Sequence, residues 1–430
     1  MKKMQTLLRR WMDHKYLTAA QITGFDNYKY SAIDTSPLSQ YVMHPFWDWL
    51  VKFFPRWFAP NLMTFLGFLF GAMNLVLLSY YDWNFEASSG DEGTTPIPSW
   101  VWMCTGINIF VAYTLDGIDG KQARRIGLSG PLGELFDHGL DSYTAMLIPT
   151  CLYSIFGRSR VYSVRPMRMY YVCLTVYFNF FVSHWEKYNT GILYLPWGYD
   201  LSMWGSTAMY LVTWWMGFER WKFEIPLGSY GTLPLGNVME AVLHVSAMAN
   251  LPLVVLNVYN SYVHRTGRLL PFWEAVRPAW PFLTYFIILL AWPFLSPNDI
   301  METDPRAIFM LSGTIFSNVS CRLIVSQMSV TRCDAWHWQM PMYAFSLFVS
   351  LWIPFLERPL LYMLLIVTTL SHWHYGSSVV NQMCEHFNRV CFTVHKRVPE
   401  EQPPKQKTPL GQDQRNMQEQ EVEQTAKKQD

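Results

Sequence analysis

The sequence predicts an all-α integral membrane protein. Of its 430 residues, 51% are apolar and 17% are aromatic, whereas only 15% are charged. Charged residues make up about a quarter of an average soluble protein. The apolar residues gather in runs close to the ~20 residues that a helix needs to cross a bilayer. We therefore expect about ten transmembrane helices, preceded by an amphipathic helix that lies in the membrane interface.

The elements follow from local composition. Residues 41–58 combine three tryptophans with scattered charges and are too short and too interrupted to span. They predict an interfacial helix, with an amphipathic helix packed on the protein itself as the alternative. The predicted spans cover approximately residues 60–80, 97–116, 136–156, 169–184, 203–218, 237–258, 278–295, 306–327, 339–356 and 359–378.

The composition excludes several other classes of protein. The net charge is +1 and no basic–aromatic surface motif occurs, so we expect no nucleic-acid partner. The seven cysteines are scattered without a C-x-x-C pair, which predicts neither a disulfide framework nor a zinc site. The first residues, M-K-K-M-Q-T-L-L-R-R, lack the apolar stretch and cleavage site of a signal peptide.

Loop charges predict the orientation. Lysine and arginine concentrate in residues 2–15, 121–125, 264–268 and 396–397, and an even number of spans puts all four segments in the cytosol. One connection disagrees, because it carries four arginines between residues 158 and 168 on the predicted lumenal side.

A cluster of four aspartates marks the predicted site. They follow the pattern D-x-x-D-G-x-x-A-R-x8-G-x3-D-x3-D and are Asp116, Asp119, Asp137 and Asp141. On helices each pair would share a face, and four like charges near lipid need compensation. Carboxylate oxygens suit Mg²⁺, Mn²⁺ or Ca²⁺, and two such ions form a clamp for phosphoryl chemistry. A solvated acidic loop is the alternative, but Gly117, Gly120 and Gly133 favour a backbone that approaches a phosphate.

This pattern is the signature of the CDP-alcohol phosphotransferase family, which the chain resembles over residues 20–390. The resemblance is closest to the ethanolamine-using members. It is carried by Y-K-Y-S-A-I-D-T-S-P-L-S (28–39), A-P-N-L-M-T-F-L-G-F (59–68) and S-H-W-E-K-Y-N-T-G-I-L-Y-L-P-W-G-Y-D (183–200). Vertebrate members of this branch carry a selenocysteine in the C-terminal tail, and this sequence has none.

The resemblance implies a division of the chain into four parts. A cytosolic N-terminal segment with the interfacial helix covers residues 1–58, and the catalytic membrane domain covers residues 59–258. Further transmembrane helices in residues 259–385 complete the bundle. Residues 386–430, rich in Gln, Glu and Lys, are expected to be a disordered cytosolic tail.

The resemblance also implies the metal ligands. Asp116, Asp119 and Asp137 would hold two Mg²⁺ or Mn²⁺ ions, with Asp141 completing the second site. These ions would neutralise the pyrophosphate of a CDP-alcohol and stabilise the departing CMP.

Other matching residues would bind the nucleotide. Gly120 and Gly133 would let the backbone pass close to it, and Arg124 would pair with phosphate. Asn61 would contact the cytidine side, although a helix N-cap is an equal alternative for this residue.

A general base must take the proton of the acceptor hydroxyl, and three residues are candidates. Asp141 shares a helix face with Asp137. His138 has the better intrinsic pKa, but one residue along a helix turns about 100°, so we expect it to point away from that face. His184 is a supporting candidate, with a buried, hydrogen-bonded histidine as the alternative.

Headgroup choice is expected at Glu186, because a carboxylate accepts the N–H donors of a primary ammonium, whereas a quaternary ammonium has none. A surface ion pair with Lys187 or another basic residue is the alternative. His372 and His374 either line the cavity or sit in the interface belt.

The activity implied by the resemblance is transfer of phosphoethanolamine from CDP-ethanolamine to 1,2-diacylglycerol, giving phosphatidylethanolamine and CMP. Use of CDP-choline, or of both donors, is the nearest alternative. A cation-coupled transporter is a remote one, since the acids lie at one membrane surface rather than at the midplane. The resemblance further implies a homodimer in the endoplasmic reticulum or Golgi membrane, with its site facing the cytosol.

Overall fold

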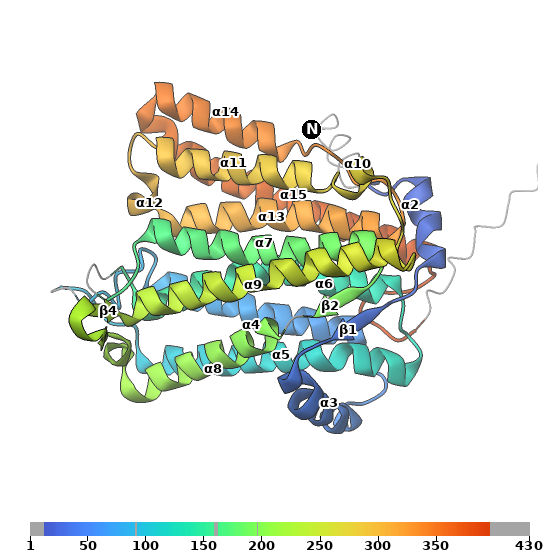
Figure 1. Ribbon diagram of the computed structural model, residues 1–430, viewed down its shortest axis with the longest axis horizontal. Helices are drawn as coiled ribbons and strands as arrows, with labels where there is room; N and C mark the ends of the chain where they lie inside the picture. The colour runs from blue at the N-terminus through green and yellow to red at the C-terminus, as the bar shows by residue number, and fades with distance from the viewer. Residues whose placement is uncertain (1–12, 91–92, 159–161, 196, 396–430) are drawn as a thin grey trace, which may run out of the picture. The chain divides into compact units, whose positions relative to one another are not determined.

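The computed structural model describes residues 13–90, 93–158, 162–195 and 197–395, and Met1–Val394 form one compact unit. Its long helices lie side by side along one direction (Figure 1). They are α4 (Pro60–Tyr81), α5 (Ser99–Ile126), α6 (Pro131–Phe156), α7 (Pro166–Thr190), α8 (Gly198–Met216), α9 (Leu235–Val263), α11 (Ala279–Leu295), α13 (Pro305–Met328), α14 (Gln339–Trp352) and α15 (Glu357–His386). Each coincides with one predicted segment, which confirms the helices.

Four of these helices, α4, α5, α9 and α13, are long and apolar enough to cross a membrane, and α11 is a shorter apolar helix. The fold is therefore that of a helical membrane protein, but ten spans are not established. Polar groups lower the hydropathy of other helices. In α7, for example, His184, Glu186 and Lys187 are polar residues that are buried within the protein.

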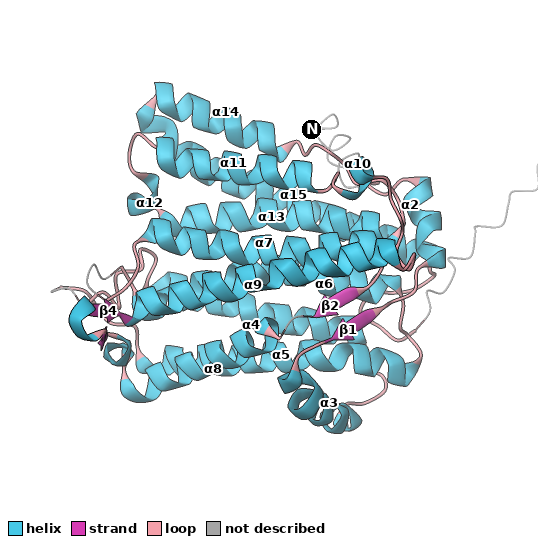
Figure 2. Cartoon of the chain, in the orientation of Figure 1, coloured by secondary structure: helices cyan, strands magenta, loops and turns pink. Residues whose placement is uncertain are grey.

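Short elements connect the helices (Figure 2). Strand β1 (Ala32–Asp34) pairs in parallel with β2 (Leu193–Leu195), and β3 (Glu224–Pro226) pairs antiparallel with β4 (Thr232–Pro234). The short helices are α2 (Ala19–Gly24), α3 (His44–Leu50), α10 (Phe272–Ala275) and α12 (Ile300–Thr303), and the single turns are η1 (Phe25–Asn27), η2 (Ser39–Met43), η3 (Val51–Phe53), η4 (Phe218–Trp221), η5 (Gly228–Tyr230) and η6 (Pro354–Leu356).

Helix α13 lies at the centre of the bundle and α9 at its surface. Of the most apolar 18-residue stretch of α13, 89% is buried inside the protein, whereas the corresponding share for α9 is 11%. Ala, Ser and Gly residues of α13 permit close packing against α6 and α7; a Cβ atom on Gly313 would lie 2.2 Å from Cγ of Met146. The exposed apolar side chains of α9, among them Val242, Val245 and Leu253, suit contact with lipid.

The predicted interfacial segment packs partly on the protein. Helix α3 buries Trp47 against α5, while Trp49 and Trp57 stay exposed. The ring of Trp47 lies so close to Gly117 that a Cβ atom there would come within 2.2 Å of it. Gly117 therefore serves helix packing, and the interpretation that it admits a phosphate is wrong.

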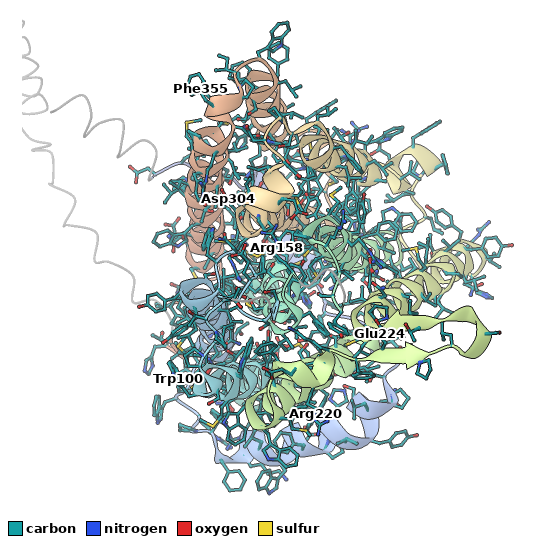
Figure 3. All side chains as sticks on the ribbon, turned by 90° about the vertical axis from the view of Figure 1, so that its left-hand side faces the viewer. Trp100, Arg158, Arg220, Glu224, Asp304 and Phe355 are labelled. Carbon is teal, nitrogen blue, oxygen red and sulfur yellow. The ribbon has the colours of Figure 1, made fainter. Side chains whose placement is uncertain are left out.

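The 158–168 connection, the exception to the predicted orientation, lies at the end of the bundle that faces the viewer in Figure 3. Arg158 forms ion pairs with Glu86 and Glu302, and Arg168 pairs with Glu240. Arg160 lies outside the described residues. The positive-inside rule counts Lys and Arg rather than net charge, so this connection remains an exception to the predicted orientation.

Candidate metal and nucleotide site

The aspartate motif is built by two helices that meet in a tight turn. Helix α5 continues to Ile126, ten residues beyond the predicted span, and ends on Gly127 at φ 70°. Helix α6 begins at Pro131, which pre-sets the helical backbone at its first position. The motif is therefore helical throughout except for residues 127–130, and each aspartate pair does share a helix face.

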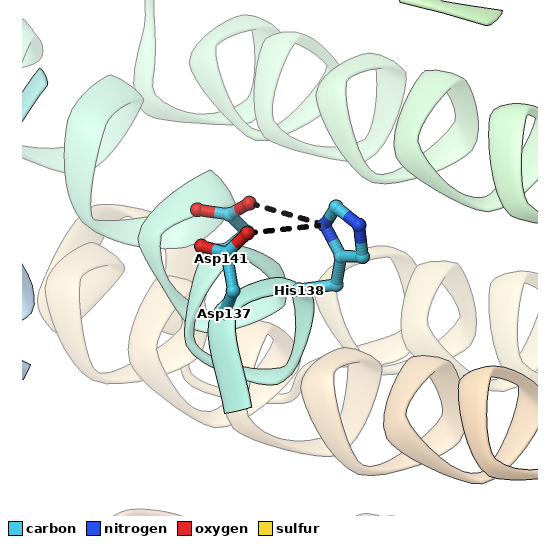
Figure 4. A group of neighbouring side chains, drawn as sticks. All are labelled: Asp137, His138 and Asp141. Atoms are coloured by element: carbon cyan, nitrogen blue, oxygen red, sulfur yellow. Dashed lines mark ion pairs between the residues drawn. The ribbon is translucent and has the colours of Figure 1, made fainter. Parts of the chain in front are cut away.

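The carboxylates converge. Oxygens of Asp116, Asp119 and Asp137 all lie within 4.8 Å of one another, and the same holds for ligand atoms of Asp137, His138 and Asp141. Figure 4 shows Asp137 and Asp141 side by side, with the ring of His138 facing both. Asp137 belongs to both groups, so the arrangement could hold cations at two adjoining positions.

These residues fit divalent ions. Among the described residues, no lysine or arginine forms an ion pair with Asp116, Asp119 or Asp137. Oδ1 of Asp137 is buried without a hydrogen-bond partner. A cation compensates carboxylates that lack a partner of opposite charge, and the oxygens of the four aspartates suit Mg²⁺ or Mn²⁺, with the His138 imidazole left outside the donor set.

Two hydroxyl groups from other helices orient the carboxylates. Thr64 of α4 donates a hydrogen bond to Oδ2 of Asp119, and Tyr199 of α8 donates one of 2.9 Å to Oδ2 of Asp116. Ligand carboxylates are commonly fixed in this way by groups behind them. Sequence reasoning missed both residues; Thr64 stands three residues after Asn61 in A-P-N-L-M-T, and Tyr199 lies in the 183–200 stretch that carries the resemblance.

The three candidates for the base lie close together. Nδ1 of His138 is 3.6 Å from Oδ2 of Asp141 and 3.9 Å from Oδ2 of Asp137. The expectation that His138 points away from these residues is wrong, because the imidazole reaches around the helix to their side. His184, which is buried, packs against His138 at 5.4 Å between ring centroids and contacts Gln327 at 3.2 Å.

A buried ion pair adjoins His138 and was also missed. Lys187 of α7 donates a hydrogen bond to Oε1 of Glu134 in α6, and the same oxygen lies 3.8 Å from Nε2 of His138. Tyr28 donates a 2.6 Å hydrogen bond to this oxygen as well. Burial, and then the charge of Glu134, raises the pKa of Tyr28, so its hydroxyl stays protonated and remains a donor.

The N-terminal segment is held over this pair by the β1–β2 ladder. Lys187 Nζ lies 5.6 Å from the ring centroid of Tyr28 and 5.3 Å from that of Tyr30. Aromatic faces at this distance stabilise an ammonium group in a partly dry site.

The predicted nucleotide residues lie beside the carboxylates. Asn61 is not the N-cap of α4, which is Ala59, so that alternative is wrong. A Cβ atom on Gly133 would lie 3.5 Å from Oδ1 of Asn61, and one on Gly120 would lie 3.5 Å from a guanidinium nitrogen of Arg124. The exposed Arg124 forms no ion pair within the described part of the chain, so its guanidinium is free for an anion.

Glu186 is placed differently from the other candidates. Its side chain is 1% exposed and accepts a 2.7 Å hydrogen bond from Asn257 of α9. The alternative of a surface pair with Lys187 is wrong, since Lys187 turns to Glu134. No contact among the described residues brings Glu186 to the carboxylates.

The two C-terminal histidines are hydrogen-bonded within the protein. His372 contacts Ser317 at 3.1 Å, and Nδ1 of His374 contacts the hydroxyl of Tyr16 at 2.8 Å. Both contacts are internal, which favours structural roles over a place in an interface belt.

Comparison with known proteins agrees with this site. Residues 57–218 match the family model described as CDP-alcohol phosphatidyltransferase. The chain is 46% identical over 385 residues to ethanolaminephosphotransferase 1 of Homo sapiens, covering 89% of this chain and 96% of that protein. The mouse protein of the same name is 44% identical over 386 residues. Choline/ethanolaminephosphotransferase 1 of Arabidopsis thaliana is 30% identical, covering 89% of this chain and 99% of that protein.

The helical membrane fold and the carboxylate site define a membrane-embedded phosphotransferase. The chain belongs to the CDP-alcohol phosphatidyltransferase family.

Proposed function

We propose that this enzyme transfers phosphoethanolamine from CDP-ethanolamine to 1,2-diacylglycerol, giving phosphatidylethanolamine and CMP. The observation that carries the proposal is the 46% identity to ethanolaminephosphotransferase 1 over 89% of the chain. The converging carboxylates support it, because the aspartates of the family motif lie close together in space. The Arabidopsis relative, whose name covers both choline and ethanolamine, favours dual donor use as the second candidate.

In the proposed mechanism, two Mg²⁺ or Mn²⁺ ions would be held by Asp116, Asp119, Asp137 and Asp141. They would supply positive charge that neutralises the pyrophosphate and the leaving CMP. Arg124 adds a charge-assisted hydrogen bond to phosphate. The nucleotide lies against Asn61, Gly120 and Gly133. The diacylglycerol oxygen attacks the phosphorus that bears ethanolamine, and the bond from that phosphorus to the CMP oxygen breaks.

The proton of the attacking hydroxyl passes to His138 in this proposal. His138 is preferred to Asp141 because a carboxylate that ligates a metal has less basicity left, whereas a neutral imidazole is suited to proton transfer near pH 7. Glu134 faces the opposite ring nitrogen and would stabilise the imidazolium that forms. His184 would support the ring by packing on it.

Detergent-purified protein should release CMP from CDP-ethanolamine when diacylglycerol and Mg²⁺ or Mn²⁺ are supplied. CDP-choline, assayed in parallel, measures donor selectivity. Failure to release CMP from either donor, while the folded protein binds Mn²⁺, would contradict the proposed activity.

We also propose that the site faces the cytosol from the endoplasmic reticulum or Golgi membrane, because the basic residues 121–125 lie beside the aspartates. The test uses sealed microsomes and an impermeant thiol reagent. A cysteine at the exposed Ser129 should react at once, and one at the exposed Thr95 only after permeabilisation. The reverse pattern would invert the orientation. The homodimer that the resemblance implies can be tested by light scattering of the detergent complex.

A further inference from the structure

The chain that follows α15 folds back onto the site. Asn388 adopts φ 51°, a left-handed conformation that Asn tolerates, and the backbone N–H of Arg389 donates to Cys384 O at 2.9 Å. These features reverse the chain direction after the helix. We call residues 387–394 the C-terminal turn.

The C-terminal turn contacts helices α4 and α6. The ring of Phe392 lies 5.3 Å from that of Phe65 in α4 and 5.6 Å from that of Phe136 in α6. Phe136 directly precedes Asp137, and Phe65 directly follows Thr64, which holds Asp119. The turn is therefore fixed to the helices that carry Asn61 and Gly133, two of the predicted nucleotide residues.

Cys391 makes the polar contact of this turn. Its Sγ accepts a hydrogen bond of 3.6 Å from Nδ2 of Asn61, and Oδ1 of the same amide faces Gly133. The thiol also hydrogen-bonds with that of Cys384. Among the described residues this is the one hydrogen bond of the Asn61 amide, so Cys391 favours the orientation in which Nδ2 faces the turn and Oδ1 faces Gly133.

We propose that the C-terminal turn is one wall of the donor-nucleotide site and that Cys391 is a positioning residue, acting through Asn61 on the cytidine side of the CDP-alcohol. This rests on the proposed function, since it takes Asn61 to be a nucleotide contact. It adds to that site a segment far along the chain, 330 positions after Asn61.

Substitution of Cys391 should change donor binding without changing the chemical step. Loss of a hydrogen bond of this kind corresponds to roughly a two- to tenfold change in affinity. Cys391→Val should raise the KM for CDP-ethanolamine by that factor and leave kcat and the KM for diacylglycerol near wild type. Cys391→Ser keeps an acceptor and should recover most of the donor affinity. Cys104→Val is the control, because Cys104 is the other half-buried thiol and lies at the far end of α5 from the motif.

A labelling experiment tests the position of the turn in the folded wild-type enzyme. N-ethylmaleimide should alkylate Cys391 in preference to the five buried cysteines, and CMP with Mg²⁺ should slow this reaction, as followed by mass spectrometry. The same nucleotide should not protect Cys104. Alkylation of Cys391 should inactivate the wild type but not Cys391→Ser.

Asn61→Ala separates the two proposals. If this variant raises the donor KM while Cys391→Val leaves it unchanged and CMP gives no protection, the inference about the turn is overturned and the proposed function stands. If CMP protects Cys391 and Cys391→Val raises the donor KM even though CDP-choline is the better donor, the turn is supported and the proposed ethanolamine activity fails.

Discussion

Nζ of Lys187 donates a hydrogen bond to Oε1 of Glu134, and both side chains are buried at the junction of α6 and α7. A buried pair of this kind is costly to break, because the remaining charge is left without compensation. The pair lies beside His138, so its loss should both destabilise the bundle and change the geometry of the site.

Lys187→Met should destabilise the protein by about 3–5 kcal/mol, the usual cost of removing one partner from a buried ion pair. Thermal unfolding of the detergent-purified protein measures the effect. The double variant Lys187→Met/Glu134→Gln removes both charges and should regain much of the lost Tm without regaining activity. Equal Tm values for the wild type and Lys187→Met would mean that the pair is open in solution.

Asp119→Asn or Asp137→Asn should abolish CMP release at any metal concentration and reduce the amount of Mn²⁺ bound, as measured by electron paramagnetic resonance. EDTA should abolish wild-type activity, and added Mg²⁺ or Mn²⁺ should restore it. The control is Asp48→Asn, because Asp48 pairs with Lys121 at the same end of α5 but is exposed. Near-normal turnover by Asp119→Asn at saturating metal would rule out the proposed ligands.

His138→Gln should lower kcat by about 10²–10⁴-fold, the usual contribution of a general base, and should leave Mn²⁺ binding intact. Asp141→Asn should lower both activity and Mn²⁺ binding if Asp141 is a ligand. The two variants therefore separate proton transfer from metal binding. A mild effect of His138→Gln together with full metal binding would assign the base elsewhere, with His184 as the next residue to test.

Glu186→Gln distinguishes headgroup recognition from a structural role. Direct recognition of a primary ammonium predicts a loss in kcat/KM of roughly ten- to hundredfold for CDP-ethanolamine and less for CDP-choline. The contact with Asn257 across the α7–α9 interface instead predicts equal, small losses for both donors. We expect equal losses, and a selective loss for CDP-ethanolamine would return Glu186 to the headgroup site.

Gly117→Ala should lower the stability of the protein by about 1–3 kcal/mol, as is usual when a methyl group is forced into a packed contact. The added Cβ atom would meet the ring of Trp47 at 2.2 Å. Gly120→Ala is the matched control for Tm, since the nearest atom there is 3.5 Å away. Similar Tm values for both variants would show that α3 moves away from α5 at little cost.

The sequence by itself determined the positions of the helices and the spacing of the four aspartates. Apolar runs are local, so they located each long helix, and the spacing of Asp116, Asp119, Asp137 and Asp141 placed each pair on one helix face. Helix ends were less well predicted. The polar residues at the end of α5 do not resemble a membrane span, although they continue the helix.

The tertiary structure decided which side chains meet. Tyr199 reaches Asp116 across 83 positions of sequence, and Lys187 reaches Glu134 across 53. Such contacts depend on how helices pack against one another, and this leaves no local pattern in the sequence. The ring of His138 was misjudged for a related reason: helical periodicity fixes the direction of Cβ, whereas the rotamer and the packing around it fix where the imidazole lies.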